Sequence, residues 1–218
     1  MVDEKMTREQ TNALISVLDD AMHVLRDDAP LNGDDLRIGK VLTVDVDKSS
    51  DQILYKFKNG SLRNVSITLL AGPDPLNYAE NRSDVPIVPV TLRIQMLDSA
   101  FGVSRLEIER KLDLAKYWID TDGIKHDGND MGAGAPPSPL LHRYRYRANP
   151  HVNSHFPVDV ELFYGDPPPD DSSSGQSLIA ITLERAYSYL TPAMRKQKRE
   201  EAAARANAAY GKSRGAEQ

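Results

Sequence analysis

Apolar residues recur at helical spacing in the first part of the chain. The residues that share this spacing are Leu14, Ile15, Leu18, Met22 and Leu25. They would form one apolar stripe along a helix. Thr7 and Gln10 stand at the spacing of a capping box, in which each side chain satisfies a free backbone N–H of the first turn. The pattern predicts a helix over residues 8–26, ended before Pro30 because proline cannot continue it.

The next region has the pattern of strands. Segments 36–45, 52–58 and 63–70 are rich in apolar residues, and each of the last two places three of them at alternate positions on one face: Ile53, Tyr55 and Phe57, then Val65, Ile67 and Leu69. Asn59-Gly60 follows the second segment directly and favours the positive φ angles of a type I′ turn. The sequence therefore predicts a three-stranded antiparallel meander with a tight turn at Asn59-Gly60.

The second part of the chain repeats this order. Ser104 and Glu107 again have capping-box spacing and predict a short amphipathic helix that reaches Leu112. Periodicity does not decide whether segment 90–97 is a strand or the start of a helix. The strands predicted after the short helix cover 141–147, 158–164 and 178–185. Polar connections rich in Gly, Pro and Asp are predicted at 71–89, 120–139 and 167–176.

These elements predict an α+β fold made of two units, each a helix with a three-stranded antiparallel sheet. The expected divisions are 1–89 for the first unit, 90–191 for the second, and 192–218 for a charged, Ala-rich helical tail. The last hairpins of the two units can be laid over each other, which suggests a duplication. The alternative is that any two amphipathic hairpins look alike.

Composition narrows the function classes. The 218 residues hold 27 basic and 32 acidic side chains, and this net charge of −5 argues against a general nucleic-acid binder. The absence of Cys excludes disulfides, thiolate metal sites and cysteine nucleophiles. No apolar run reaches the roughly 20 residues of a membrane helix, and the charged start of the chain is unlike a secretory signal. We expect a cytoplasmic protein, or a periplasmic one if a signal sequence has been removed.

No strong catalytic motif is present, so we expect neither an enzyme nor a cofactor. The chain lacks a phosphate-binding GxxxxGK[ST] loop, a GxSxG elbow and an HExxH motif. Asp45, Asp47 and Asp51 do not match the spacing of a calcium loop and are read as a polar connection. His151 and His155 stand four residues apart, but Pro150 and Pro157 disfavour the helix that would present both to a metal.

Two acidic loops are the candidate partner-binding sites. Their carboxylates are Asp120, Asp122, Asp127 and Asp130 in the first loop, and Asp166, Asp170 and Asp171 in the second. Such carboxylates can steer a basic partner. Calcium binding by the first loop is the alternative, as is ordinary turn chemistry.

Arginines alternate with tyrosines along segment 141–147, as on some nucleic-acid-binding strands. Because the surrounding region is slightly acidic, we favour another role for Arg143, Arg145 and Arg147. We expect them to pair with Asp159 and Glu161 across neighbouring strands, or to meet a protein partner.

The segment Phe101-Gly102-Val103-Ser104-Arg105-Leu106-Glu107-Ile108-Glu109-Arg110-Lys111-Leu112 resembles the helix opening of SmpA/OmlA-like (BamE-like) domains. In that family an antiparallel sheet follows the helix, and the resemblance extends over residues 98–187. The glycine usual in the family after the leucine is replaced by Asp113, and the 120–139 segment is an insertion.

Small α+β domains of this kind resemble immunity proteins of bacterial toxin systems, including type VI secretion. The resemblance implies a non-catalytic bacterial protein that binds and neutralises one cognate toxin. A structural or assembly adaptor of an envelope or secretion complex is the alternative. A metal-dependent hydrolase that uses the 120–130 loop and the histidines is a third possibility.

Overall fold

The structure, a computed structural model, describes residues 4–31, 37–48, 51–73, 85, 87–133, 141–166, 175–187, 196–197 and 200–201. Asp170 and Asp171 lie outside the described residues, as does most of the predicted tail 192–218. Of the described helices, none combines the length and the apolarity needed to cross a membrane.

The first helix is confirmed. α1 (Arg8–Arg26) begins after Thr7, whose hydroxyl accepts the N–H of Gln10 at 3.2 Å, while the Gln10 amide oxygen accepts the N–H of Thr7 at 2.8 Å. This reciprocal capping box satisfies two of the free N–H groups of the first turn. The helix ends at Asp27, and Asp28 turns the chain with a φ of 56°.

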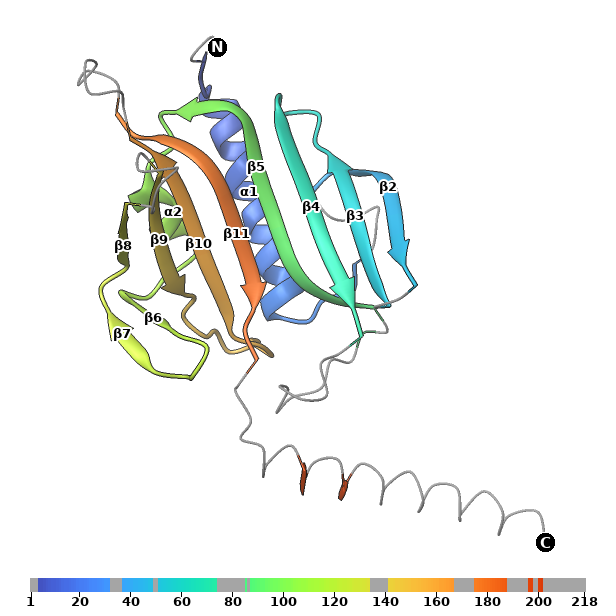
Figure 1. Ribbon diagram of the computed structural model, residues 1–218. Coiled ribbons are helices and arrows are strands. Elements are labelled where there is room, and N and C mark those ends of the chain that lie inside the picture. Colours follow the sequence, from blue (N-terminus) through green and yellow to red (C-terminus); the bar gives the residue numbers. More distant parts are fainter. Residues whose placement is uncertain are drawn as a thin grey trace, which may run out of the picture.

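One sheet of nine strands dominates the molecule (Figure 1). Its strands are β1 (Glu4–Lys5), β2 (Lys40–Asp47), β3 (Gln52–Lys58), β4 (Val65–Gly72), β5 (Val88–Phe101), β8 (Asp130–Ala133), β9 (Leu141–Arg147), β10 (Val158–Gly165) and β11 (Ser177–Arg185). They lie in the order β2-β3-β4-β5-β11-β10-β9-β8, with antiparallel pairing throughout, and β1 runs parallel to the end of β5. A separate hairpin, β6 (Tyr117–Ile119) with β7 (Lys125–Asp127), protrudes beside β9.

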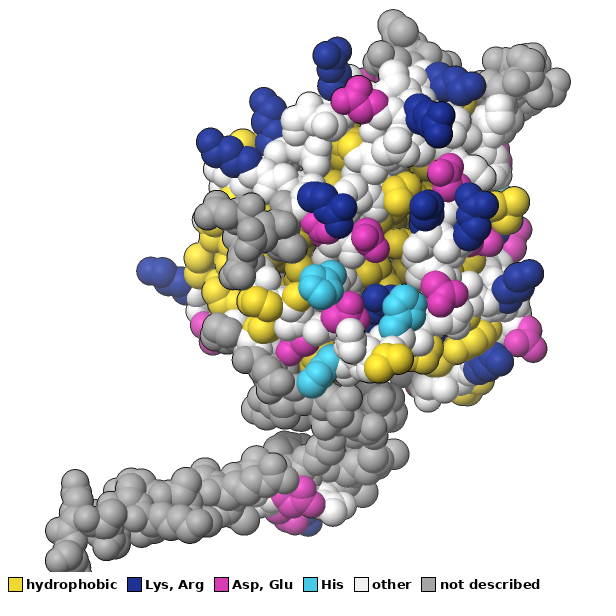
Figure 2. All heavy atoms as spheres, turned by 180° about the vertical axis from the view of Figure 1, so that it is seen from behind, with side chains coloured by type: hydrophobic (Ala, Val, Ile, Leu, Met, Phe, Trp, Pro, Cys, Tyr) yellow, Lys and Arg dark blue, Asp and Glu magenta, His cyan; other side chains and the backbone are white. Residues whose placement is uncertain are grey.

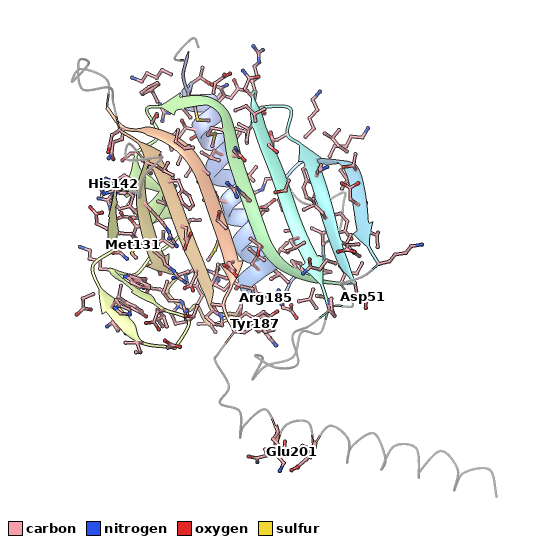
Figure 3. All side chains as sticks on the ribbon, viewed as in Figure 1. Asp51, Met131, His142, Arg185, Tyr187 and Glu201 are labelled. Carbon is pink, nitrogen blue, oxygen red and sulfur yellow. The ribbon has the colours of Figure 1, made fainter. Side chains whose placement is uncertain are left out.

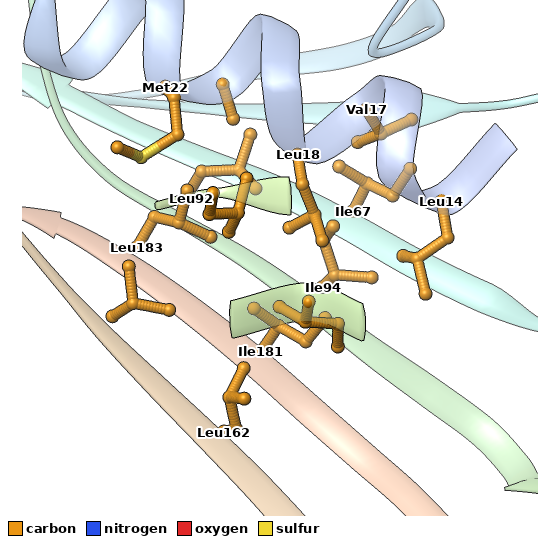
Figure 4. Packing of buried hydrophobic residues seen from close by; sticks show 14 of the residues in the cluster. Leu14, Val17, Leu18, Met22, Ile67, Leu92, Ile94, Leu162, Ile181 and Leu183 are labelled. Atoms are coloured by element: carbon orange, nitrogen blue, oxygen red, sulfur yellow. The ribbon is translucent and has the colours of Figure 1, made fainter. Parts of the chain in front are cut away.

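The sheet has an inner face and an open face. α1 lies across the inner face behind β5 and β11, and α2 (Arg105–Lys111) lies near it on the same side (Figure 1). The core fills the space between α1 and these strands (Figure 4). Its members include Leu14, Leu18, Met22, Ile67, Leu92, Ile94, Ile181 and Leu183, none of them more than 2% exposed. Each such burial stabilises the fold by about 1.5–3 kcal/mol.

The predicted fold class, α+β with two helix-plus-three-stranded units, is wrong. β5 pairs with β4 on one side and with β11 on the other, so both sets of strands join in one mostly antiparallel sheet. The reason is that β5 has 14 residues and offers both of its edges for pairing. The division expected between residues 89 and 90 falls inside this strand.

The predicted meander is confirmed as β2-β3-β4, but its turn is wrong. The connection between β3 and β4 covers residues 59–64, and the positive φ of 53° falls on Asn64 instead of Gly60. Asn59 holds the connection in place, because its side-chain amide donates to the carbonyl of Arg37 at 2.9 Å and its oxygen accepts the N–H of Ser61 at 3.0 Å. Extra side-chain hydrogen bonds thus favour a longer loop over the two-residue turn.

In the second part, α2 and strands β9, β10 and β11 are confirmed, and segment 90–97 belongs to strand β5. The Ser104 side chain makes no capping hydrogen bond, so the predicted second capping box does not form. The prediction of a loop over 120–139 is also wrong, because β7 and β8 lie within that range.

Candidate functional site: a charged cleft beside the β6–β7 hairpin

The arginines of β9 form a ladder of ion pairs on the open face. Arg147 binds Asp159 through two hydrogen bonds of 2.6 and 3.3 Å. Arg145 lies 3.6 Å from Asp159 and 3.5 Å from Glu161, and Arg143 also binds Glu161. β9 and β10 bring these residues together because their register places Asp159 opposite Arg147 and Glu161 opposite Arg145. The predicted cross-strand pairing is confirmed.

The β6–β7 hairpin is held rigidly by Asp120. The Asp120 carboxylate accepts the N–H groups of Asp122 and Ile124 at 3.0 and 2.8 Å and lies 2.7 Å from Nε2 of His126. The hydrogen bond with His126 and the two backbone N–H groups hold the pKa of Asp120 below its usual range. Asp120 is therefore a structural residue of the turn, and its carboxylate is already hydrogen-bonded within the hairpin.

An aromatic residue joins the hairpin to the ladder. The ring of Trp118 stacks on His126 with centroids 4.2 Å apart, and the Arg145 guanidinium lies 5.1 Å from the Trp118 ring. Such a cation–π contact is worth on the order of 1 kcal/mol. Trp118 thus attaches the hairpin to the sheet by its contact with Arg145.

A cleft of about 730 Å³ lies between the turn of the hairpin and the end of the open face. We call it the hairpin cleft, and its charged lining consists of Asp120, Asp122, Arg145, Arg147, Asp159, Glu184 and Arg185. Its floor includes Arg185 and Tyr187, which Figure 3 labels at the lower end of β11. This volume falls within the range of ordinary ligand sites.

Two carboxylates in the hairpin cleft do not belong to the ladder of ion pairs. Among the described residues, neither Asp122 on the hairpin nor Glu184 on the sheet takes part in a hydrogen bond or an ion pair through its side chain. The pKa of Glu184 is raised, first because the cleft partly desolvates the carboxyl and then because Asp159 and Glu161 carry the same charge. Since the cationic groups beside them are engaged by Asp159, Glu161 and Asp28, the cleft favours a cation.

The structure brings two other predicted residues together, at a different place. Asp130 lies 2.6 Å from Nε2 of His142, and Asp166 lies 3.9 Å from Nδ1 of the same ring. Although desolvation opposes it, the N–H of Gly132 and the contact with His142 lower the pKa of Asp130. Gln176 donates to Asp166 at 2.7 Å. These aspartates fasten the ends of β8, β9 and β10 and are not part of the hairpin cleft.

Asp127 is the last of the predicted partner-binding carboxylates that the structure describes. Its side chain is 94% exposed, and the nearest cation is Lys125, at 3.9 Å. Ile124, on the same hairpin, is an apolar side chain that is 57% exposed. The hairpin therefore presents an apolar side chain between two exposed carboxylates, Asp122 and Asp127.

Two of the predicted histidines pair with different aspartates, His142 with Asp130 and His151 with Asp113. His151 lies 3.4 Å from Asp113, near the end of α1, and Figure 2 shows histidine and acidic side chains gathered on this face. Within the described part of the chain, no three His, Asp or Glu side chains come close enough to hold a metal ion. Asp45, the first residue of the rejected calcium loop, pairs with Lys56 at 3.0 Å.

Sequence reasoning missed Trp118, His126 and Glu184. The hairpin had a usable signal, because the apolar run 117–119 is followed by Asp122-Gly123, a common turn pair between strands. No sequence signal marked Glu184, since its position in the cleft depends on β11 lying next to β10.

Comparisons of the chain with models of protein families, with curated proteins and with solved structures found no match. The resemblance of residues 98–187 to SmpA/OmlA-like domains thus stays a prediction.

Proposed function

We propose that this chain is a non-catalytic protein-binding module, and specifically an immunity protein that neutralises a cognate bacterial toxin of type VI secretion or a similar system. The observation that carries the proposal is the pair of unpaired carboxylates, Asp122 and Glu184, on opposite walls of the hairpin cleft. The proposed partner offers a basic side chain to this cleft. A cytoplasmic location, expected from the sequence, belongs to the same proposal.

The rigidity of the hairpin supports binding. Ordering a loop at an interface costs about 0.5–1.5 kcal/mol for each immobilised side chain, and this cost is avoided when the free protein already holds the bound conformation. The contacts of Asp120 with His126 and of Trp118 with Arg145 fix the hairpin in advance. Ile124 at its tip is available as an apolar anchor, surrounded by carboxylates at the rim.

Charge supports a basic partner. The net charge of −5 attracts cationic surfaces over the whole molecule, and Asp122 and Glu184 add to the hairpin cleft two carboxylates that form no ion pair with the described residues. A toxin that acts on nucleic acid or on phospholipid carries basic residues where it meets phosphate. Carboxylates that occupy that surface would block its substrate.

The proposal is tested with the product of a gene adjacent to this one as the candidate toxin. Co-expression of the full-length chain should prevent toxicity, and the purified proteins should form a complex. Asp122→Asn with Glu184→Gln should lower the association rate about 3–10-fold at low salt and reduce its salt dependence, because two steering charges are lost. Ile124→Ala should instead speed dissociation.

Asp51→Asn is the matched control. It removes one exposed carboxylate at the turn between β2 and β3, across the sheet from the hairpin (Figure 3), and Asn tolerates the φ of 53° there. Its association rate should equal that of the wild type. Equal losses in Asp51→Asn and in the cleft variant would show that only net charge matters, and a candidate toxin that neither binds nor is neutralised would contradict the proposal.

A further inference from the structure

A second cavity, of about 300 Å³, lies where the end of α1, strand β6 and the connection between β9 and β10 meet. Its volume is at the lower end of the range of ordinary ligand sites. We call it the arginine cavity, because Arg26 and Arg147 line it. Among the described residues of its lining there is no Asp or Glu, whereas the hairpin cleft is lined by carboxylates as well as arginines. The two sites share Arg147 but differ in the charge that they present.

Each of the two arginines has one guanidinium nitrogen that its aspartate does not bind. Arg26 donates to Asp27 through Nε and Nη2, at 2.8 and 3.3 Å, and Arg147 donates to Asp159 through the same two nitrogens. Within the described part of the chain, Nη1 of Arg147 makes no hydrogen bond, and Nη1 of Arg26 has only a ring nitrogen of His151, 3.5 Å away. These side chains are 15% and 12% exposed, so both Nη1 groups would gain from an acceptor that a ligand brings.

The rest of the lining is largely apolar and is held in place. Tyr117 and Phe156 contribute aromatic rings, and Pro150 and Pro157 contribute two further apolar side chains. The loop that carries Phe156 is fixed to the end of α1, because the N–H of Phe156 donates to the carbonyl of Arg26 at 2.9 Å. A cavity whose walls are already ordered avoids the entropy cost of forming when a ligand enters.

We propose that the arginine cavity binds an aromatic monocarboxylate. Its carboxylate accepts hydrogen bonds from Nη1 of Arg26 and of Arg147, and its ring packs among the aromatic and proline side chains of the walls. Asp27 and Asp159 already balance most of the charge of the two arginines, so a singly charged ligand suits the cavity better than a phosphate dianion. The carboxylate belongs either to a small free acid or to an aromatic residue at the end of a peptide, which offer the same chemistry. The proposal does not depend on the toxin partner.

An NMR titration of the full-length wild type tests the proposal with two probes, sodium benzoate and the tripeptide Gly-Gly-Phe with its free carboxylate. Saturable shifts of the amides of residues 148–149 and 154–156 are expected, with a Kd below about 1 mM for at least one probe. The amide of Ile124, at the tip of the hairpin, should not shift. The probe that binds more tightly identifies the source of the carboxylate. Benzamide, which lacks the charge, should bind at least about tenfold more weakly than benzoate.

Arg26→Gln is the test variant, because it removes one of the two donors and keeps the backbone carbonyl that fixes the loop. It should weaken the binding of the tighter probe at least about tenfold. Arg93→Gln is the matched control, since Arg93 is exposed on β5 and makes no side-chain hydrogen bond with the described residues, and it should bind like the wild type. The proposal is overturned if neither probe shifts these amides in the wild type, or if benzamide binds as tightly as benzoate. Unchanged affinity in folded Arg26→Gln would overturn it as well.

Discussion

The two halves of the open face use similar ion pairs in different surroundings. On β2 and β3, Asp45 and Lys56 meet at 3.0 Å with side chains 58% and 48% exposed. On β9 and β10, Arg147 and Asp159 meet at 2.6 Å with side chains only 15% and 11% exposed. Water screens the first pair, whereas the second lies within the ladder beside the hairpin. Position in the sheet therefore decides how much an ion pair contributes to stability.

The largest expected effect comes from the most buried pair. Arg185 is fully buried, binds Asp28 at 2.9 Å and the carbonyl of Val24 at 3.0 Å, and thereby joins the end of β11 to the end of α1. Arg185→Leu leaves the Asp28 carboxylate buried without its counter-charge, and we expect a loss of about 3–5 kcal/mol in the free energy of unfolding. Urea unfolding followed by circular dichroism measures it.

The double variant Asp28→Asn with Arg185→Leu is the control for that experiment. It removes both charges, so its loss should be smaller than the sum of the two single losses. A loss below about 1 kcal/mol for Arg185→Leu would show that Asp28 is satisfied by other groups.

The comparison of the two halves is tested most directly by one matched pair of substitutions. Asp159→Asn removes a buried carboxylate that binds Arg145 and Arg147, and it should cost about 2–3 kcal/mol. Asp45→Asn makes the same chemical change on β2 and should stay within about 0.5 kcal/mol of the wild type. Equal losses in urea unfolding would remove the distinction between the halves.

The first half should be more sensitive to its backbone geometry than to its charges. Gly39 has a φ of 139°, and a Cβ there would lie 2.6 Å from the carbonyl oxygen of Lys58. Gly39→Ala should therefore cost about 1–3 kcal/mol through backbone strain. Gly60→Ala is its control, because nothing lies within 4 Å and its φ is not positive. Thermal melting should leave the control unchanged or slightly more stable.

The smallest expected effect is local to the hairpin. Because the pKa of Asp120 is lowered in the folded state, its contribution is complete above the usual value of 3.8 and is lost as the pH falls through the lowered pKa. Trp118 is the only tryptophan, so its fluorescence reports on the hairpin. Acidification below about pH 4 should change this fluorescence before the circular dichroism of the sheet changes.

Asp120→Asn is the test variant for the acid response. It lacks the titrating carboxylate, so the early change in fluorescence should disappear, while Asp127→Asn, on the exposed side of the same hairpin, should retain it. An early change of equal size in both variants would show that another group controls the hairpin.

Local elements of this fold could be predicted from the sequence because their signals lie within a few residues. The capping box at Thr7 and Gln10 located α1, and alternation located β3, β4, β9 and β10. The order of strands could not be predicted, since β5 and β11 pair across about 90 residues of chain and alternation carries no information on which strand lies beside which. Two hairpins therefore suggested two units where the structure has one sheet.

In the candidate site, too, contacts between neighbouring strands could be predicted and contacts that depend on the order of strands could not. Pairing of the β9 arginines with Asp159 and Glu161 was predictable because neighbouring strands alternate in charge. The meeting of Asp130 and Asp166 at His142 was not, because it depends on where β8 and the end of β10 lie relative to β9. The acidic character of Asp120 is plain from the sequence, but its contact with His126 requires the β6–β7 hairpin, and the sequence predicts a loop there.

The central position of β11 affects how the protein folds while it is being synthesised. This strand is the last of the sheet to leave the ribosome, yet it fills the middle position between β5 and β10. Until it emerges, the nascent chain holds two partial sheets, each with an apolar strand edge that awaits its neighbour. Domains fold as units during synthesis, and such exposed edges favour aggregation. Chaperone binding before residue 185 emerges from the ribosome, and release soon after it, is the pattern that this topology implies.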